Sequence, residues 1–458
     1  MLALKNRTME ITTFNDDLLG LEDFAHRLEQ FIKIEGDFVE GSLVIGLSSK
    51  FGSGKTTFLR MWMSSLRDSE NNEEKPLLIF LNAWESDYYG DPLFAIISAL
   101  IDAIKKEGGS AEKLVNAAKD FGWFTLAIGG QVVKKFTGID AFEAGEIAEI
   151  KKKERGNGLQ LPFDAFSIYE ARKKAMESLR QAIREFVESS APKVLFLVDE
   201  LDRCRPDYAI SYLETIKHIF DIKGAVFLLA ADRQQLENSA KAAFGTGLDF
   251  NEYYRKFVHR EVTLPEISED AYRNIARKYV DYYLERDGAR YCFMNLDSYR
   301  VDNIVELISS LKLTPRQIQE AFRILGHLLE TTEEKRGNIL WCLGVASIMM
   351  SVLKVGRQDI FHLLGTQQFD YRKAIIFFRY KLNINSYDWW FILCLTGGGL
   401  KLEEGEDIQS VMKNVGLLKE DEEFDSSELG QWYSGWGRRT SDRFSQIYKN
   451  IEQLNKWD

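Results

Sequence analysis

The sequence predicts an α/β protein with a parallel sheet core, followed by a mainly α-helical region. Four short runs are continuous in apolar residues, as expected for parallel strands that are covered on both faces, and helical patterns alternate with them. After Pro265 strand signals become sparse and helical patterns dominate. The four apolar runs are residues 43–47, 76–81, 193–198 and 225–230.

The elements expected in chain order begin with an amphipathic helix at about 21–32. The strand at 43–47 leads through a glycine-bearing turn into a helical run over 56–66. Another amphipathic helix pattern, over 208–220, lies between the third and fourth strands. Residues 104–161 interrupt the alternation with glycine pairs and a charged run, so we expect a helical insertion there.

Composition narrows the class of protein. At 458 residues the chain exceeds what a single core usually organises, so two or three domains are expected. The net charge of -11 argues against a broad phosphate-binding surface of the kind that nonspecific DNA-binding proteins carry. The four cysteines form no C-x-x-C pair, so neither a disulfide framework nor a zinc site is expected.

The amino terminus and the apolar stretches predict where in the cell the protein is found. The amino terminus turns polar too soon for a signal peptide, and the longest apolar stretches fall short of the roughly 20 residues that a spanning helix needs. We therefore expect a cytoplasmic protein with no membrane span.

A glycine-rich loop is the first candidate site. Residues 52–56, Gly-Ser-Gly-Lys-Thr, directly follow a buried strand and directly precede a helix, which is the position of a phosphate-binding loop. Backbone N–H groups of such a loop converge on phosphates, and the helix amino terminus adds a partial positive charge. Lys55 would reach the β- and γ-phosphates of ATP, and the Thr56 hydroxyl would hold Mg²⁺. The residues expected to contact the nucleotide are Ser49, Lys50, Phe51, Gly52, Ser53, Gly54, Lys55, Thr56 and Thr57.

One position departs from the full loop pattern. A glycine is expected five residues before Gly54, where this chain has Ser49. Serine fits if its φ is negative, whereas a strained backbone would cost about 1 kcal/mol or more. The alternative to a nucleotide site is a glycine turn that leads into an exposed lysine.

Two carboxylates, Asp199 and Glu200, directly follow the third strand. They would lie at the carboxyl edge of the parallel sheet, where ligands bind. We expect Asp199 to contact the Mg²⁺ shell and Glu200 to orient and deprotonate the attacking water. The alternative is a polar turn in which Asp202 caps the helix that begins near Pro206. A phosphate loop and an acidic strand end in this order favour ATP binding and hydrolysis.

Around these two sites the chain resembles the KAP family of P-loop NTPases, a branch of the STAND and AAA-like ATPases, over about residues 15–330. Residues 46–56 match the family pattern G-x-x-G-x-W-G-S-G-K-[ST] except at Ser49 and Phe51. Residues 81–84, Leu-Asn-Ala-Trp, are similar to the F-N-A-W strand end of the family.

The most specific resemblance is residues 198–206, Val-Asp-Glu-Leu-Asp-Arg-Cys-Arg-Pro, which are similar to D-D-L-D-R-C-x-P. Glu200 replaces the second aspartate, and glutamate is the usual water-activating residue of AAA-type ATPases at this position. Residues 231–233, Ala-Asp-Arg, resemble the sensor-one segment, in which Asp232 would sense the γ-phosphate. Residues 313–318 resemble the sensor-two segment of AAA-like lids, so Arg316 would reach the phosphates; the alternative places it on the solvated face of a helix.

An arginine finger would stabilise the charge of the transferred phosphate, most usefully in the site of a neighbouring subunit. Arg255 is the preferred candidate, because the preceding pair Tyr253 and Tyr254 could anchor an interface. Arg203, Arg233 and Arg260 are the other candidates, and for each the alternative is a surface ion pair.

The expected protein is a cytoplasmic KAP-type ATPase that uses ATP and Mg²⁺ and acts as a switch or sensor. Its parts would be a P-loop NTPase core over 1–265 with the insertion at about 104–161, a helical lid over 266–330 and a helical interaction or effector region over 331–458. The resemblance allows a role in an anti-phage or mobile-element system, with self-association or a partner effector protein as output.

Two other functions stay open. One is a nonhydrolysing, nucleotide-bound scaffold. The other is a nucleic-acid-dependent motor or clamp loader, for which the basic run Lys151 to Arg155 and the aromatic and arginine-rich segment Trp432 to Arg439 are the candidate contacts. The alternatives for these segments are a solvated loop and a turn in the core.

Overall fold

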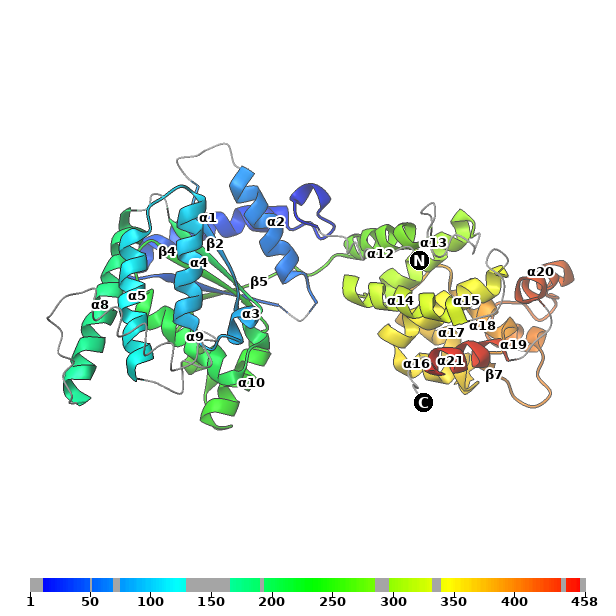
Figure 1. Ribbon diagram of the computed structural model, residues 1–458. Coiled ribbons are helices and arrows are strands. Elements are labelled where there is room, and N and C mark those ends of the chain that lie inside the picture. Colours follow the sequence, from blue (N-terminus) through cyan, green and yellow to red (C-terminus); the bar gives the residue numbers. More distant parts are fainter. Residues whose placement is uncertain are drawn as a thin grey trace. The chain divides into compact units, whose positions relative to one another are not determined.

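The computed structural model divides the chain into two compact units, Met1–Pro265 and Glu266–Asp458 (Figure 1). The further division of the second unit into a lid and an interaction region stays a prediction. The structure describes residues 11–49, 52–68, 75–128, 165–189, 193–284, 296–331, 339–437 and 442–453.

The N-terminal unit contains a five-stranded sheet in which all neighbouring strands are parallel, in the order β2-β3-β4-β1-β5. The predicted parallel sheet is confirmed, and the four apolar runs correspond to β1 to β4. The sequence pattern misses β5 because its residues are mostly polar, which an edge strand tolerates. The strands are β1 (Leu43–Ser48), β2 (Leu77–Asn82), β3 (Val194–Asp199), β4 (Ala225–Ala231) and β5 (Arg260–Thr263).

Helices cover both faces of the sheet. Each strand contributes to two apolar cores, because successive side chains along a strand point to opposite faces. Phe196 and Phe227 belong to one apolar core, whereas Leu197 and Leu228 belong to the other. The helices of the second core are α1 (Glu22–Phe38) and α2 (Lys55–Asp68). The helices of the first are α4 (Pro92–Lys106), α5 (Glu112–Ile128), α8 (Ala165–Ser189), α9 (Pro206–Ile219) and α10 (Arg233–Phe244) (Figure 1). Shorter elements are η1 (Phe14–Asp16), α3 (Ala83–Asp87), η3 (Leu201–Arg203) and α11 (Phe250–Tyr254).

The segment expected as an insertion, at about 104–161, begins within α4 and contains α5, which packs beside α8. Phe121 of α5 is buried, and its ring centroid lies 6.1 Å from that of Phe94. The first part of the segment therefore contributes to the core. The basic run Lys151 to Arg155 lies outside the described residues. Within the described parts of the chain, no helix combines the length and apolarity needed to cross a bilayer.

The C-terminal unit is mainly helical, as predicted, with one small addition. Two-residue strands, β6 (Phe369–Asp370) and β7 (Leu400–Lys401), form a parallel pair. Its helices are α12 (Glu269–Leu284), α13 (Ser298–Ser310), α14 (Pro315–Thr331), α15 (Trp341–Gly356), α16 (Gln358–Gly365), α17 (Tyr371–Ile376), the π-helix η5 (Phe377–Lys381), α18 (Tyr387–Thr396), α19 (Ile408–Asn414), α20 (Ser426–Trp436) and α21 (Arg443–Gln453).

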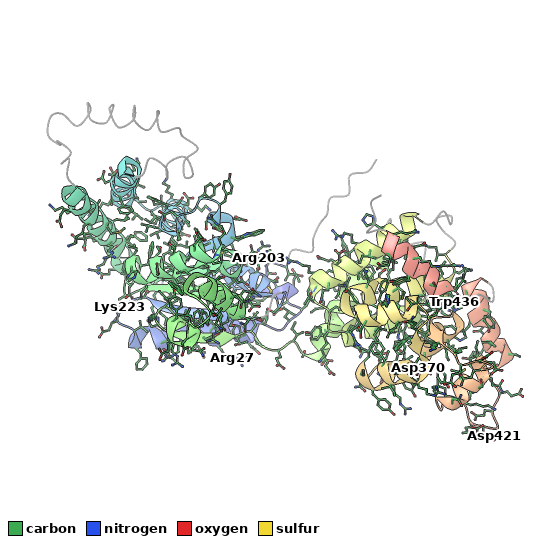
Figure 2. All side chains as sticks on the ribbon, turned by 90° about the horizontal axis from the view of Figure 1, so that it is seen from below. Arg27, Arg203, Lys223, Asp370, Asp421 and Trp436 are labelled. Atoms are coloured by element: carbon green, nitrogen blue, oxygen red, sulfur yellow. The ribbon has the colours of Figure 1, made fainter. Side chains whose placement is uncertain are left out.

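A cluster of tryptophans lies in the interior of this unit. The ring centroids of Trp341 and Trp432 are 5.0 Å apart, and Trp436, which Figure 2 labels, is fully buried and donates from Nε1 to Thr396 Oγ1 at 3.0 Å. Both tryptophans of the segment Trp432 to Arg439 are therefore buried, and they lie in helix α20 rather than in a turn, whereas Arg438 and Arg439 lie outside the described residues. Those rings are not a surface on which bases could stack.

A glycine at the end of α16 permits close packing in the same unit. A Cβ atom at Gly365 would lie 2.1 Å from Cγ of Tyr448 in α21. Gly365→Ala should therefore lower the free energy of unfolding of this unit by about 1–3 kcal/mol, because tight cores resist added atoms. Denaturant unfolding followed by circular dichroism measures the change. The matched control is Gly430→Ala in α20, where a Cβ has open space; equal midpoints for the two variants would contradict the packing argument.

Candidate functional site

The loop between β1 and α2 has a backbone that two glycines make possible. Gly52 and Gly54 have φ values of 82° and 96°, in the left-handed region that favours glycine. Ser49 does not adopt a positive φ, so the serine at this position introduces no strain of that kind. The Ser53 hydroxyl oxygen is buried and has no hydrogen-bond partner among the described residues. Two of the predicted nucleotide contacts, Lys50 and Phe51, lie outside those residues.

Lys55, the first residue of α2, is only 8% exposed. Its ammonium donates to the Ser49 carbonyl oxygen at 2.5 Å. Burial lowers the pKa of Lys55, while the nearby carboxylates of Asp202, Asp232 and Asp199 act in the opposite direction. The structure therefore excludes the alternative of an exposed lysine and places a buried cation beside the loop.

Thr56 and Asp199, the two residues predicted to hold Mg²⁺, are brought together. Asp199 ends β3, is 2% exposed and accepts hydrogen bonds from the Thr56 hydroxyl and from the Glu200 N–H. Burial raises the pKa of Asp199, and these two hydrogen bonds oppose the rise. Hydroxyl and carboxylate oxygens are ligands that Mg²⁺ prefers, so the pair fits this ion.

Glu200 is held by side chains from two directions. Its Oε2 accepts a hydrogen bond from Asn82 Nδ2 at 3.1 Å, and its Oε1 lies 2.9 Å from a guanidinium nitrogen of Arg203, which Figure 2 labels. Its backbone has φ 59° and ψ 25°, a left-handed conformation that is uncommon for a residue other than glycine. Such strained backbone clusters at functional sites.

Asp202 and Asp232 join the acidic turn to the end of β4. Asp202 Oδ2 accepts from the Asp232 N–H at 3.0 Å, and Asp232 Oδ1 caps α10 by accepting from the Gln234 N–H at 3.0 Å. The alternative in which Asp202 caps the helix near Pro206 is wrong: α9 begins at Pro206, but no side chain caps it. Asp202 is instead directed to the turn that carries Asp232.

The arginines expected near the phosphates lie in different surroundings. Arg233 pairs with Glu261, at 3.3 Å between Nε and Oε2, and Arg260 pairs with Glu35, at 3.1 Å between Nε and Oε1. Arg255 is exposed directly after α11 and forms no ion pair with a described residue. Its proposed role as an arginine finger stays a prediction.

Arg316 belongs to the C-terminal unit. It lies in the first turn of α14, which begins at Pro315, and it is exposed, as the alternative of a solvated helix face expects. Its predicted contact with the phosphates stays a prediction.

Sequence reasoning gave no role to two residues that organise this edge, although Asn82 belongs to the Leu-Asn-Ala-Trp segment that resembles the family. Asn82 ends β2 and pairs in register with Asp199, so its side chain reaches Glu200. Asp87 is buried and accepts hydrogen bonds from the backbone N–H and Nε of Arg205, each at 2.9 Å. The signal for Asn82 was a polar residue at the end of an apolar strand. Asp87 carried no comparable signal, because its partner lies 118 positions away.

The assembled edge of the sheet combines a phosphate-loop backbone, a buried cation, a hydroxyl and several carboxylates. Over residues 23–332 the chain matches the KAP family P-loop domain. It is 22% identical over 312 residues to the Phage T7 exclusion protein of Escherichia coli (strain K12), an alignment that covers 63% of this chain and 38% of that relative. The chain thus spans well under half of the relative's length.

A solved structure of the Aeropyrum pernix ORC2 protein, in ADPNP-ADP complexes, is similar over 98% of each chain, with 15% sequence identity and a TM-score of 0.35. At that score the likeness carries no argument about function or assembly. The family match, in contrast, covers more than half of the chain and includes both motifs at the edge of the sheet. The chain belongs to the KAP family of P-loop NTPases.

Proposed function

We propose that this chain binds ATP with Mg²⁺ and hydrolyses it. The observation that carries the proposal is the contact between the Thr56 hydroxyl and the buried Asp199 carboxylate, directly beside a glycine-rich loop at a helix amino terminus. Two oxygen ligands for a hard cation thus meet where the loop would hold phosphates. The buried, unpartnered Ser53 hydroxyl is a further polar group that a bound phosphate would satisfy.

In this proposal the loop residues 49–57 bind the phosphates through their N–H groups. Lys55 leaves the Ser49 carbonyl oxygen and donates to the β- and γ-phosphates, while Thr56 and Asp199 hold Mg²⁺. The ion, when bound, offsets the negative charge of the phosphates. The carboxylates near Lys55 favour its charged form, which this role requires.

Glu200 is proposed to orient the attacking water and to accept its proton. Asp232 would sense the γ-phosphate, since it lies at the end of β4 and its N–H is fixed by Asp202. Arg316 would contact the phosphates from the C-terminal unit, and Arg255 would act in the site of a neighbouring subunit. Such a cycle would make the protein a nucleotide-controlled switch whose output is self-association or a partner protein.

A role in excluding phage is the biological setting we propose. Its support is the similarity to the Phage T7 exclusion protein, of which this chain spans 38%. A plaque assay in bacteria that express the chain tests it, with Lys55→Ala as the nucleotide-binding control. Equal plaque numbers for wild type, Lys55→Ala and empty vector, over a panel of phages, would reject this setting.

A nonhydrolysing scaffold is the second candidate, and one observation favours it. Both carboxylate oxygens of Glu200 already have donors, Asn82 and Arg203, which compete with a water molecule. Steady-state ATP turnover of wild type beside Lys55→Ala and Glu200→Gln, with and without DNA or RNA, separates the functions. If wild type bound ATP but turned it over no faster than these two variants, the scaffold function would be established. Strong stimulation by nucleic acid would instead indicate a motor or clamp loader.

A further inference from the structure

Arg203 lies between the proposed catalytic glutamate and a surface aromatic ring. One guanidinium nitrogen is 2.9 Å from Glu200 Oε1, and the guanidinium carbon is 5.5 Å from the ring centroid of Trp84. A cation within about 6 Å of an indole face is attracted to it. The ring of Trp84 therefore supports the guanidinium in the position from which it binds Glu200.

The second donor to Glu200 also leads back to Trp84. The Asn82 side chain donates through Nδ2 to Glu200 Oε2, and its Oδ1 accepts from the Trp84 N–H at 3.1 Å and from the Glu85 N–H at 3.2 Å. The two donors that hold the Glu200 carboxylate thus both depend on the first turn of α3. Trp84 contributes its backbone N–H to one and its ring to the other.

The Trp84 ring is accessible at the protein surface. The residue is 52% exposed, although a large apolar side chain is usually covered. Arg203 and Glu200 are less exposed, at 29% and 16% of their side chains. The Trp84 ring, which supports the restraint, therefore lies at the surface, and the Glu200 carboxylate lies further inside.

We propose that Trp84 is a positioning residue that restrains Glu200 through Arg203, so that displacing its ring frees the carboxylate for the attacking water. The inference rests on the proposed hydrolysis of ATP. Trp84 touches neither the loop nor the residues proposed to bind Mg²⁺ in the contacts described, so its effect should fall on turnover. Binding of the nucleotide should be unchanged.

The test is steady-state ATP turnover by the full chain with the ring removed, Trp84→Ala. We expect kcat to rise about two- to fivefold, the ratio that corresponds to one cation–π contact at a partly exposed site, with KM for ATP unchanged. Trp84→Phe keeps an aromatic face and should stay close to wild type. Tyr88→Ala is the matched control: Tyr88 is 85% exposed on the same edge, and its described ring contact is with Tyr89.

A purely structural role for Trp84 makes a different prediction. If the ring only stabilised α3, Trp84→Ala would lower kcat or the melting temperature. Its effect on kcat would then be the same whether residue 200 was glutamate or, in the double variant with Glu200→Gln, glutamine. In our proposal the rise in kcat disappears in that double variant, because it requires the carboxylate.

The outcomes separate this inference from the proposed function. Turnover by wild type with equal kcat for Trp84→Ala and Tyr88→Ala would reject the restraint alone. ATP binding without turnover in wild type and in Trp84→Ala would reject hydrolysis and, with it, the restraint. Turnover that appears only when the Trp84 ring is removed would support both.

Discussion

Lys55→Ala is expected to weaken ATP binding by roughly 100-fold or more, because hydrogen bonds to charged groups contribute about 1.5–3 kcal/mol each and Lys55 would contact two phosphates. Lys55 is buried, and its ammonium already lies beside the loop at the Ser49 carbonyl oxygen. No rearrangement of α2 is needed to turn this cation toward a bound phosphate. Titration with a fluorescent ATP analogue in the presence of Mg²⁺ measures the change.

The control for this variant must remove a cation from the same helix without touching the loop. Arg60→Ala meets that need, since Arg60 is exposed on α2. Removal of Lys55 also takes away a cation that lies near Asp199, Asp202 and Asp232, so melting curves of both variants are needed to show that they are folded. If folded Lys55→Ala bound ATP as tightly as Arg60→Ala, the loop would not be the nucleotide site.

Glu200→Gln is expected to keep ATP binding and to lower kcat by about 10²–10⁴-fold, the usual contribution of a general base. Glutamine has the size of glutamate and can still accept a hydrogen bond from Arg203, but it cannot take a proton from water. The expected result is a variant that saturates with ATP and turns over slowly. Turnover is followed by release of phosphate, and binding by the same titration.

Glu85→Gln is the matched control for this change. It makes the same substitution at an exposed side chain of α3, the short helix that follows β2. If Glu200→Gln had a normal kcat while the separate variant Lys55→Ala was inactive, another group would activate the water. The same pair of variants, tested for copurifying proteins, would show whether an ATP-bound form retains a partner.

Much of the fold could be predicted because its signals are local. An apolar run of five or six residues beside amphipathic helical patterns is enough to predict a buried parallel strand, and β1 to β4 confirm this. The edge strand β5 could not be predicted, because polar residues carry no such pattern. The packing role of Gly365 could not be predicted either, because the ring of Tyr448 for which it makes room is distant in sequence.

The candidate site likewise combines residues that local motifs predict with contacts that only the fold determines. Lys55, Thr56, Asp199 and Glu200 were named from motifs, since each lies at a fixed offset from a strand end. The hydrogen-bond partners of the Glu200 carboxylate could not be predicted. Asn82 reaches it only because β2 and β3 are neighbours in the sheet, and 118 positions separate the two residues. Whether Ser49 needs a positive φ was likewise open in the sequence, and the structure shows that it does not adopt one.

By itself, the sequence determined the order of strand, phosphate loop and helix, the acidic end of the third strand and the family to which the chain belongs, because these depend on neighbours along the chain. Only the tertiary structure decided that Thr56 meets Asp199, and that Glu200 is held by Asn82 and by an arginine resting on Trp84. The physical reason is that parallel strands end at one common edge, where side chains far apart in the chain come within hydrogen-bond distance.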